Sequence, residues 1–302
     1  MPGRAPSSVR GRTARCLLRS LSPLASVLLA TAESGAANRL DKSGYHLFNP
    51  VPDDQLREMS TDRPDKTESP HTVDAGHFQV ESDLVSYSRN DDESGGGDTR
   101  VESWAVAHIN FKIGLLNDVD LQTVIETYNH ITTEDRVAGP TTRQSGFGDL
   151  TSRVKVNLWG NDGGTTALAV MPFVKFPTSQ DDVGNDSVEG GIILPLGVGL
   201  PAGFDLGAMT EVDFNRDERG GGHHAEFIHT IEVGRDLLGP IGGYVEFFNA
   251  VSTESDTEWV GTVDVGFTYG LTANVQLDCG VNIGVTDSAD DYNPFLGLSV
   301  RH

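Results

Sequence analysis

Asn274-Val-Gln-Leu-Asp-Cys-Gly-Val-Asn-Ile-Gly284 alternates between apolar residues and polar or small ones along its whole length. Successive side chains of a β-strand point to opposite faces, so this stretch has one apolar face and one polar face. The preceding stretch, Trp259 to Tyr269, repeats the alternation and has aromatic residues at its ends. Two adjacent amphipathic strands of this kind are typical of a membrane barrel that turns its apolar side chains to lipid.

The same pattern divides the rest of the chain, after about Ala75, into segments separated by turn residues. The sequence predicts an all-β fold, an antiparallel up-and-down transmembrane β-barrel of about 12 strands. An even number of strands closes the barrel and leaves no unpaired backbone edge in lipid. The expected strands cover residues 77–88, 100–113, 119–129, 147–159, 165–177, 187–199, 204–215, 224–236, 242–252, 258–269, 274–285 and 293–302.

Compact connections alternate with longer acidic or glycine-rich ones, and we expect the compact ones to face the periplasm. Aromatic residues near the strand ends predict two girdles at the membrane interfaces. The compact connections are 114–118, 160–164 and 270–273, and the longer ones are 89–98, 131–145, 178–186 and 216–223. The girdle residues are Phe176, Phe214, Trp259 and Tyr292 on the outer side, and Phe78, Trp159, Phe204, Tyr244 and Tyr269 on the inner side.

A soluble β-sandwich or barrel with inward apolar faces is the alternative, because alternation does not say which face meets lipid. Charged residues on the polar face of nearly every expected strand favour the membrane barrel. Hydrophobic residues make up only 37% of the chain, which leaves little for a conventional core. Residues 165–199 alternate poorly and contain Pro172 and Pro195, so the pattern is weakest there.

The N-terminal residues read as a secretory signal peptide, 1–37, in which arginines precede an apolar stretch and small residues follow. A disordered basic tail is the alternative. Residues 38–75 are expected to form a polar periplasmic segment and 76–302 the β-barrel, in the outer membrane of a diderm bacterium. The 38–75 segment is also long enough to enter the lumen as a plug.

Charge and cysteine content exclude several classes of protein. The net charge of -22 makes nucleic acid an unsuitable partner, because phosphates bind basic surfaces. Cys16 lies in the proposed signal peptide and Cys279 is alone after it, so the processed chain cannot form an internal disulfide.

The stretch Ser60-Thr-Asp-Arg-Pro-Asp-Lys-Thr-Glu-Ser-Pro70, followed by Gly76-His-Phe-Gln-Val-Glu81, resembles the entry to the first strand in the phenol meta-pathway degradation (MetA-pathway) family of bacterial outer-membrane barrels. Further similarity lies at 145–150, 172–177 and 295–300. The resemblance implies a membrane barrel and a transport role, but no particular substrate. Such barrels usually end in an aromatic residue, whereas this chain ends in His302.

If the barrel is a channel, the side chains on the polar faces of the strands set its selectivity. Most of them are acidic, and rings of carboxylates favour cations. The alternative is that the few basic side chains pair with the carboxylates and brace a narrow, plugged lumen. The candidate pore-lining residues are Glu81, Asp83, Lys112, Asp120, Glu126, Arg153, Lys155, Glu211, Asp213, Glu232, Glu246, Asp264 and Asp278.

We therefore expect a passive channel or transporter for small solutes, with aromatic or hydrophobic compounds suggested by the resemblance, and no enzyme and no cofactor. A structural or surface-binding barrel without transport is the alternative, and an outer-membrane lipase a weaker one. No metal site is expected, although His223 and His224 beside Glu226 carry ligand groups, because adjacent strand residues point apart. The expected partners are outer-membrane lipid, small solutes and the barrel-insertion machinery, which would read the C-terminal strand.

Overall fold

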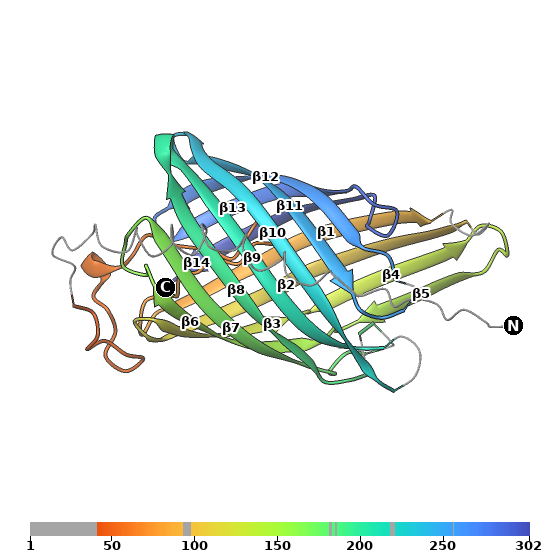
Figure 1. The fold of residues 1–302 in the computed structure, drawn as a ribbon, viewed down its shortest axis with the longest axis horizontal. Helices are drawn as coiled ribbons and strands as arrows, with labels where there is room; N and C mark the ends of the chain where they lie inside the picture. The colour runs from red at the N-terminus through yellow and green to blue at the C-terminus, as the bar shows by residue number, and fades with distance from the viewer. Residues whose placement is uncertain (1–40, 93–97, 181–182, 185, 218–220, 256) are drawn as a thin grey trace, which may run out of the picture. The chain divides into compact units, whose positions relative to one another are not determined.

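The backbone from Phe78 to Arg301 forms one antiparallel sheet that closes on itself as a transmembrane β-barrel (Figure 1). This computed structural model describes residues 41–302 except 93–97, 181–182, 185, 218–220 and 256. The proposed signal peptide lies outside the described residues. No helix in the described part of the chain is long and apolar enough to cross a membrane.

The sheet consists of fourteen strand segments in the described residues, and a short 3₁₀ turn, η1 (Asp53–Gln55), precedes them. In chain order the segments are β1 (Phe78–Asp92), β2 (Thr99–Leu116), β3 (Val119–Ile125), β4 (Tyr128–Asp135), β5 (Thr141–Gly146), β6 (Leu150–Trp159), β7 (Thr166–Phe176), β8 (Glu189–Leu200), β9 (Phe204–Arg216), β10 (His223–Leu238), β11 (Ile241–Ser252), β12 (Val260–Thr272), β13 (Val275–Gly284) and β14 (Tyr292–Arg301).

Two strands of the barrel are interrupted, so fourteen segments occupy twelve strand positions. β3 and β4 both pair with β2, β3 along residues 109–116 and β4 along 99–106. On the next strand position, β6 pairs with β3 and β5 pairs with β4. Each of the pairs β3/β4 and β5/β6 therefore fills one position, and the prediction of twelve strands is confirmed.

The barrel closes through β1, which pairs with β14 on one side and with β2 on the other. The closure extends beyond the last strand, because the backbone N–H of His302 donates to the carbonyl of Phe78 and the N–H of Phe78 donates back, at 2.8 and 2.9 Å. Every strand position thus has two hydrogen-bonded neighbours, as a spanning sheet in hydrocarbon requires.

Burial in this barrel is the reverse of burial in a soluble protein. Its largest fully buried side chains include Lys112, Lys155, Gln122 and Glu246, whereas leucine, valine and phenylalanine side chains are exposed on most strands. The buried apolar cluster is small and is formed by Met171, Ile193 and Met209. A soluble barrel would bury its apolar face. The structure therefore overturns the soluble alternative, and the apolar outer face is the one that meets lipid.

The two ends of the barrel differ in the length of their connections. At the short-turn end lie residues 117–118, 160–165, 201–203, 239–240 and 273–274, together with the C-terminus and the segment that leads into β1 (Figure 1). At the long-loop end lie 136–140, 177–188 and 285–291. The expected alternation of short and long connections is thus present except at 136–140, which is a tight turn.

The structure corrects two details of the predicted pattern. Residues 131–145 are not a loop, because β4 and β5 extend through most of them as a hairpin closed by the turn at 136–140. Tyr244 does not belong to the inner girdle for which it was predicted: it is 7% exposed and lies on the lumen face of β11, which carries the buried Glu246. The tyrosine is two residues from that glutamate, and side chains two apart share a face.

Candidate functional site

Residues 57–75, here called the plug segment, lie inside the barrel. Their side chains and backbone N–H groups contact wall residues of β1, β2, β3, β6 and β9 to β13. These strands surround the whole lumen, so a single segment can reach all of them only from within. The placement of the preceding residues in the periplasm stays a prediction, as do the domain boundaries.

The plug segment and the wall are joined by ion pairs. Acidic plug residues contact basic residues of the wall, and basic plug residues contact acidic ones. The ion pairs are Asp62 with Lys112 and Lys155, Glu68 with Arg153, Arg63 with Asp83 and Asp278, and Lys66 with Asp264. Both signs occur within the short sequence Asp62-Arg-Pro-Asp-Lys-Thr-Glu68.

The ion pairs of Asp62 are the most deeply buried of this set. Its carboxylate lies 2.6 Å from the Nζ of Lys155 and also contacts the Nζ of Lys112, and all three side chains are at most 3% exposed. Lys112 contacts Glu81 as well, and the backbone N–H of Asp62 donates to Glu81 at 3.0 Å. A buried charge is tolerated only when it is paired, so these groups depend on one another.

Arg63 joins the plug segment to the neighbouring part of the wall, at β1 and β13. Its guanidinium reaches Asp83 of β1 at 2.6 Å and Asp278 of β13 at 2.7 Å. The arginine passes directly over Gly297 of β14, where a Cβ atom would lie 2.1 Å from a guanidinium nitrogen. A side chain at position 297 would therefore force the guanidinium to shift from this position.

The following residues of the plug segment contact β10, β11 and β12. The Nζ of Lys66 lies 3.2 Å from Asp264 and 4.3 Å from the ring centre of Phe248. The hydroxyl of Thr67 donates to Glu246 at 2.5 Å and lies 2.6 Å from the hydroxyl of Thr230. Neutral and charged contacts together fix this part of the segment.

A second network holds the base of the plug segment at the short-turn end. Asp74 is 1% exposed and contacts Lys42 at 3.2 Å and Arg57 at 3.4 Å. Arg57 also contacts Asp162, in the turn between β6 and β7, at 3.1 Å. Partial burial opposes ionisation of Asp162, but a hydrogen bond from Asn117 and the charges of Arg57 and Lys42 hold its pKa below the usual range.

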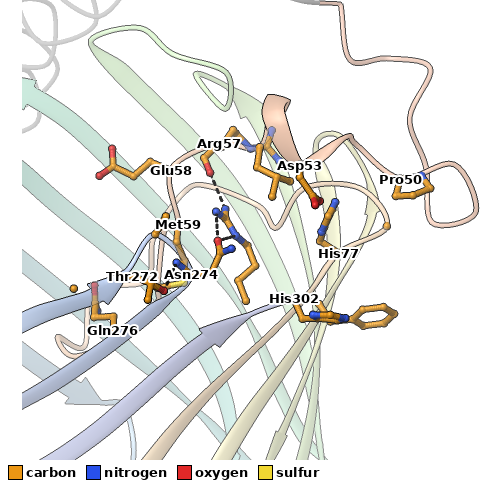
Figure 2. Close-up of a pocket in the computed structure, with 16 residues that line it drawn as sticks. Pro50, Asp53, Arg57, Glu58, Met59, His77, Thr272, Asn274, Gln276 and His302 are labelled. Atoms are coloured by element: carbon orange, nitrogen blue, oxygen red, sulfur yellow. Dashed lines mark hydrogen bonds between the residues drawn. The ribbon is translucent and has the colours of Figure 1, made fainter.

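The rim beside this network contains a cavity of about 780 Å³ (Figure 2). It lies between the start of the plug segment and the end of the barrel, and Figure 2 shows Arg57, Asn274 and His302 around it. Arg301 donates to the carbonyl of Arg57 at 2.7 Å and to the side chain of Asn274 at 2.7 Å. The cavity is thus bordered by groups that tie the plug segment to the last turn and the last strand.

A second cavity, of about 340 Å³, lies between the plug segment and β7 to β10. The plug contributes Asp65 and Glu68, and the wall contributes Glu232 and Asp205 beside several glycines, including Gly197 and Gly207. The plug segment is therefore held tightly by the strands around β1, β2 and β11 to β13, and space remains on the side of β8 and β9.

Most of the predicted pore-lining residues contact the plug segment. Glu232 lines the smaller cavity, and Glu211 and Asp213 lie on the face of β9 that carries the buried Met209. Glu126 lies in the break between β3 and β4, against Gly148. The nine that contact the plug segment are Glu81, Asp83, Lys112, Asp120, Arg153, Lys155, Glu246, Asp264 and Asp278.

The partners of these wall residues were missed by the sequence analysis. Arg57, Asp62, Arg63, Lys66 and Glu68 were not proposed as site residues, although the closely spaced opposite charges of the stretch were visible. The signal that could have identified them was the presence of acidic residues in that stretch, because they are suitable partners for the few basic residues of an otherwise acidic wall. Lys112, Arg153 and Lys155 do brace the lumen, but mainly through plug carboxylates rather than through other wall residues.

A closed twelve-position barrel with a polar, charged interior and an apolar exterior defines the class of the protein as an outer-membrane β-barrel. A family model described as "Putative MetA-pathway of phenol degradation" matches residues 61–302, and the chain belongs to this family. The matched region begins inside the plug segment and includes every strand. The resemblance seen in the sequence is thereby confirmed.

Two solved structures share the fold at low sequence identity. An outer membrane channel from Pseudomonas putida F1 is 12% identical, with a TM-score of 0.55, and the match covers 80% of this chain and 98% of that one. The transport unit of the autotransporter AIDA-I from Escherichia coli is 11% identical, with a TM-score of 0.53, covering 80% and 92%. A search of curated proteins finds no match.

Proposed function

We propose that the protein is a passive channel for small solutes, narrowed by its own plug segment. The observation that carries this proposal is the charged, closed lumen that the plug segment occupies without filling the side next to β8 and β9. No chemical step is required of such a protein, and we propose that it is not an enzyme. In this proposal the thirteen predicted pore-lining residues form the wall of the pathway, and the nine that contact the plug segment also attach it to that wall.

The charge of the remaining space supports a preference for cations. Asp65, Asp205 and Glu232 line the smaller cavity, together with Glu68, whose charge is balanced by Arg153. Carboxylates that border a narrow aqueous path attract cations and repel anions. Asp264 and Asp278 add little negative charge to the pathway, because Lys66 and Arg63 of the plug segment neutralise them.

The orientation follows from the rule that short turns face the periplasm and longer loops face outward. The plug segment and the C-terminus then lie at the periplasmic end of an outer-membrane protein, after export by the signal peptide. The insertion machinery would read β14, and the apolar outer face would contact lipid. Small aromatic or hydrophobic compounds are the solute class to test first, because the family description refers to phenol degradation and the Pseudomonas relative is a channel.

A barrel without transport is the second candidate, and the ionic contacts of the plug segment favour it. Asp62, Lys112 and Lys155 are almost completely buried, so this side of the lumen is closed. The two candidates differ in whether solutes pass between the plug segment and the wall at β8 and β9.

Conductance of the refolded mature protein in a planar lipid bilayer tests the proposal. We expect discrete current steps and a reversal potential in a salt gradient that indicates a higher permeability for cations. Swelling of protein-containing vesicles in phenol or in sugars of increasing size then gives the solute range. Insertion without conductance or swelling would rule out the channel and leave the non-transporting barrel.

A further inference from the structure

A histidine and two carboxylates converge at the long-loop end of the barrel, away from the plug segment. Asp217 follows β9, His224 lies in the second position of β10, and Glu254 follows β11. The Nδ1 of His224 lies 3.1 Å from Asp217 Oδ1 and 3.5 Å from Glu254 Oε2. The three ligand atoms all lie within 4.8 Å of one another.

The separations fit a shared metal ion. Zinc binds histidine nitrogen and carboxylate oxygen at roughly 2.0–2.2 Å in tetrahedral sites, which places neighbouring ligand atoms on the order of 3.3 Å apart. The two measured nitrogen-to-oxygen distances, 3.1 and 3.5 Å, bracket that value.

Backbone contacts hold the ligands in place. The N–H of Asp217 donates to the carbonyl of Gly222 across the β9–β10 connection, at 3.1 Å. The N–H of Glu254 donates to the hydroxyl of Ser252 at 3.0 Å, and its carbonyl accepts from Thr257 at 2.9 Å. The three side chains are only 25%, 13% and 14% exposed. Ligands that are already in position lose little conformational entropy on binding.

The neighbouring histidine does not take part. Adjacent residues of a strand point to opposite faces, and His224 shares the face of Thr230, which contacts the plug segment inside the lumen. His223 points the other way, and its Nε2 lies 3.4 Å from the hydroxyl of Ser187. Glu226 accepts a hydrogen bond from Asn215 at 3.1 Å. The partners of His224 are therefore Asp217, seven positions earlier in the β9–β10 connection, and Glu254, which follows β11, rather than its immediate neighbours in the sequence.

We propose that Asp217, His224 and Glu254 bind a divalent transition-metal ion of the zinc class at the mouth of the lumen. Imidazole and carboxylate together suit zinc and its neighbours better than calcium, which takes oxygen ligands alone. Water completes the coordination. The ion links the β9–β10 connection to the β11–β12 connection, so it fixes two loops at the entrance.

Calorimetric titration of Zn²⁺ into the refolded full barrel, in detergent and against a competing chelator, tests the site. We expect one saturable site in the wild type and at least a tenfold weaker affinity in His224→Ala and in Glu254→Gln. His223→Ala is the matched control and is expected to bind as the wild type does. Heat-modifiable migration on a gel establishes that each variant is folded. His223 and His224 pair with Arg216 and Asn215 at the outer end of the β9–β10 pair, and Glu254 follows β11.

Three results would overturn the proposal. They are a wild type that shows no saturable Zn²⁺ binding, a folded His224→Ala that binds as tightly as the wild type, and a His223→Ala that loses as much affinity as His224→Ala. Binding of Ca²⁺ in place of Zn²⁺ would also overturn it, because the imidazole would then have no role.

Discussion

Asp62 is a single carboxylate that faces two buried lysines, and this makes it the most sensitive residue of the plug segment. Substitution by asparagine keeps its size but leaves Lys112 and Lys155 without their shared counter-charge. Removal of one member of a buried ion pair costs about 3–5 kcal/mol. The lower part of that range corresponds to an increase on the order of 100-fold in the population of the released segment.

We therefore predict that Asp62→Asn exposes the plug segment to protease. Trypsin cleavage after Lys66, followed by mass spectrometry, reports that exposure in the refolded barrel. Asp54→Asn, on the exposed η1 turn, is the control and should leave the cleavage rate unchanged. Equal cleavage rates in wild type and Asp62→Asn would show that the buried ion pairs do not hold the segment.

Asp162 gives a prediction about pH at the rim. Its pKa is lowered in the folded protein, so its contribution to stability is complete above the ordinary aspartate pKa, about 3.9, and is lost as the pH falls through the folded value. Asp162→Asn removes that contribution. We expect the variant to be less stable than the wild type toward urea between pH 5 and pH 8, and the difference to shrink as the pH falls below about 4 and to vanish once the pH lies below the folded pKa. A difference that persists unchanged in acid would contradict the ionic role of Asp162.

At the scale of elements, the plug segment is tied to β10 by two threonine hydroxyls 2.6 Å apart. Thr67→Cys combined with Thr230→Cys places two thiols where a disulfide can form, in a background in which the free Cys279 is replaced by serine. We predict that oxidation reverses any rise in conductance caused by Asp62→Asn, and that reduction restores it. Thr67→Cys alone is the control. If oxidation of the double variant leaves the raised conductance unchanged, the segment does not control the passage.

The last strand carries another prediction, which concerns folding efficiency. The backbone of His302 completes the pairing with β1, and its side chain is exposed. Alternation along β14 places it on the side of the exposed Leu296, where barrels of this class usually have an aromatic residue. His302→Phe should increase the folded fraction recovered after expression, measured by heat-modifiable migration. An unchanged or lower fraction would show that the histidine serves equally well.

Element by element, the sequence predicted the strands better than the loops. The two-residue alternation of β12 and β13 persists through each strand, so their positions agree with the structure within a few residues. β4 and β5 were missed because Asn129 to Glu134, apart from Ile131, and Thr141 to Ser145 are polar on both faces and give no alternation. Backbone pairing with neighbouring segments, rather than an apolar face, makes them strands.

At the scale of the whole molecule, the contacts that occlude the lumen join residues that are far apart in sequence. Arg63 and Asp278 are separated by 215 positions, and nothing local to either one predicts the contact. The alternation of the strands predicted that the wall carboxylates point inward. It did not predict that the plug segment neutralises them. The sequence thus predicted the wall of the lumen and left open what occupies it.

The selectivity of the whole barrel depends on carboxylates that face the remaining space. Glu232 lines the smaller cavity on the side that the plug segment leaves open. We predict that Glu232→Gln lowers the cation-to-anion permeability ratio, measured as a shift of the reversal potential toward zero in a salt gradient. Glu258→Gln, in an exposed loop, is the control. An unchanged ratio in Glu232→Gln would mean that ions take another route.

The exchange of charges between plug segment and wall also restricts how the family can diverge. A wall lysine that mutates alone leaves a buried carboxylate without its partner, whereas a simultaneous change at 62 and at 112 or 155 can keep the charges balanced. Relatives should therefore differ at these positions in compensating sets, so an alignment deep enough to detect covariation would show position 62 linked to positions in β2 and β6. A chimera that joins the plug segment of one relative to the barrel of another should fold poorly wherever such a set is split.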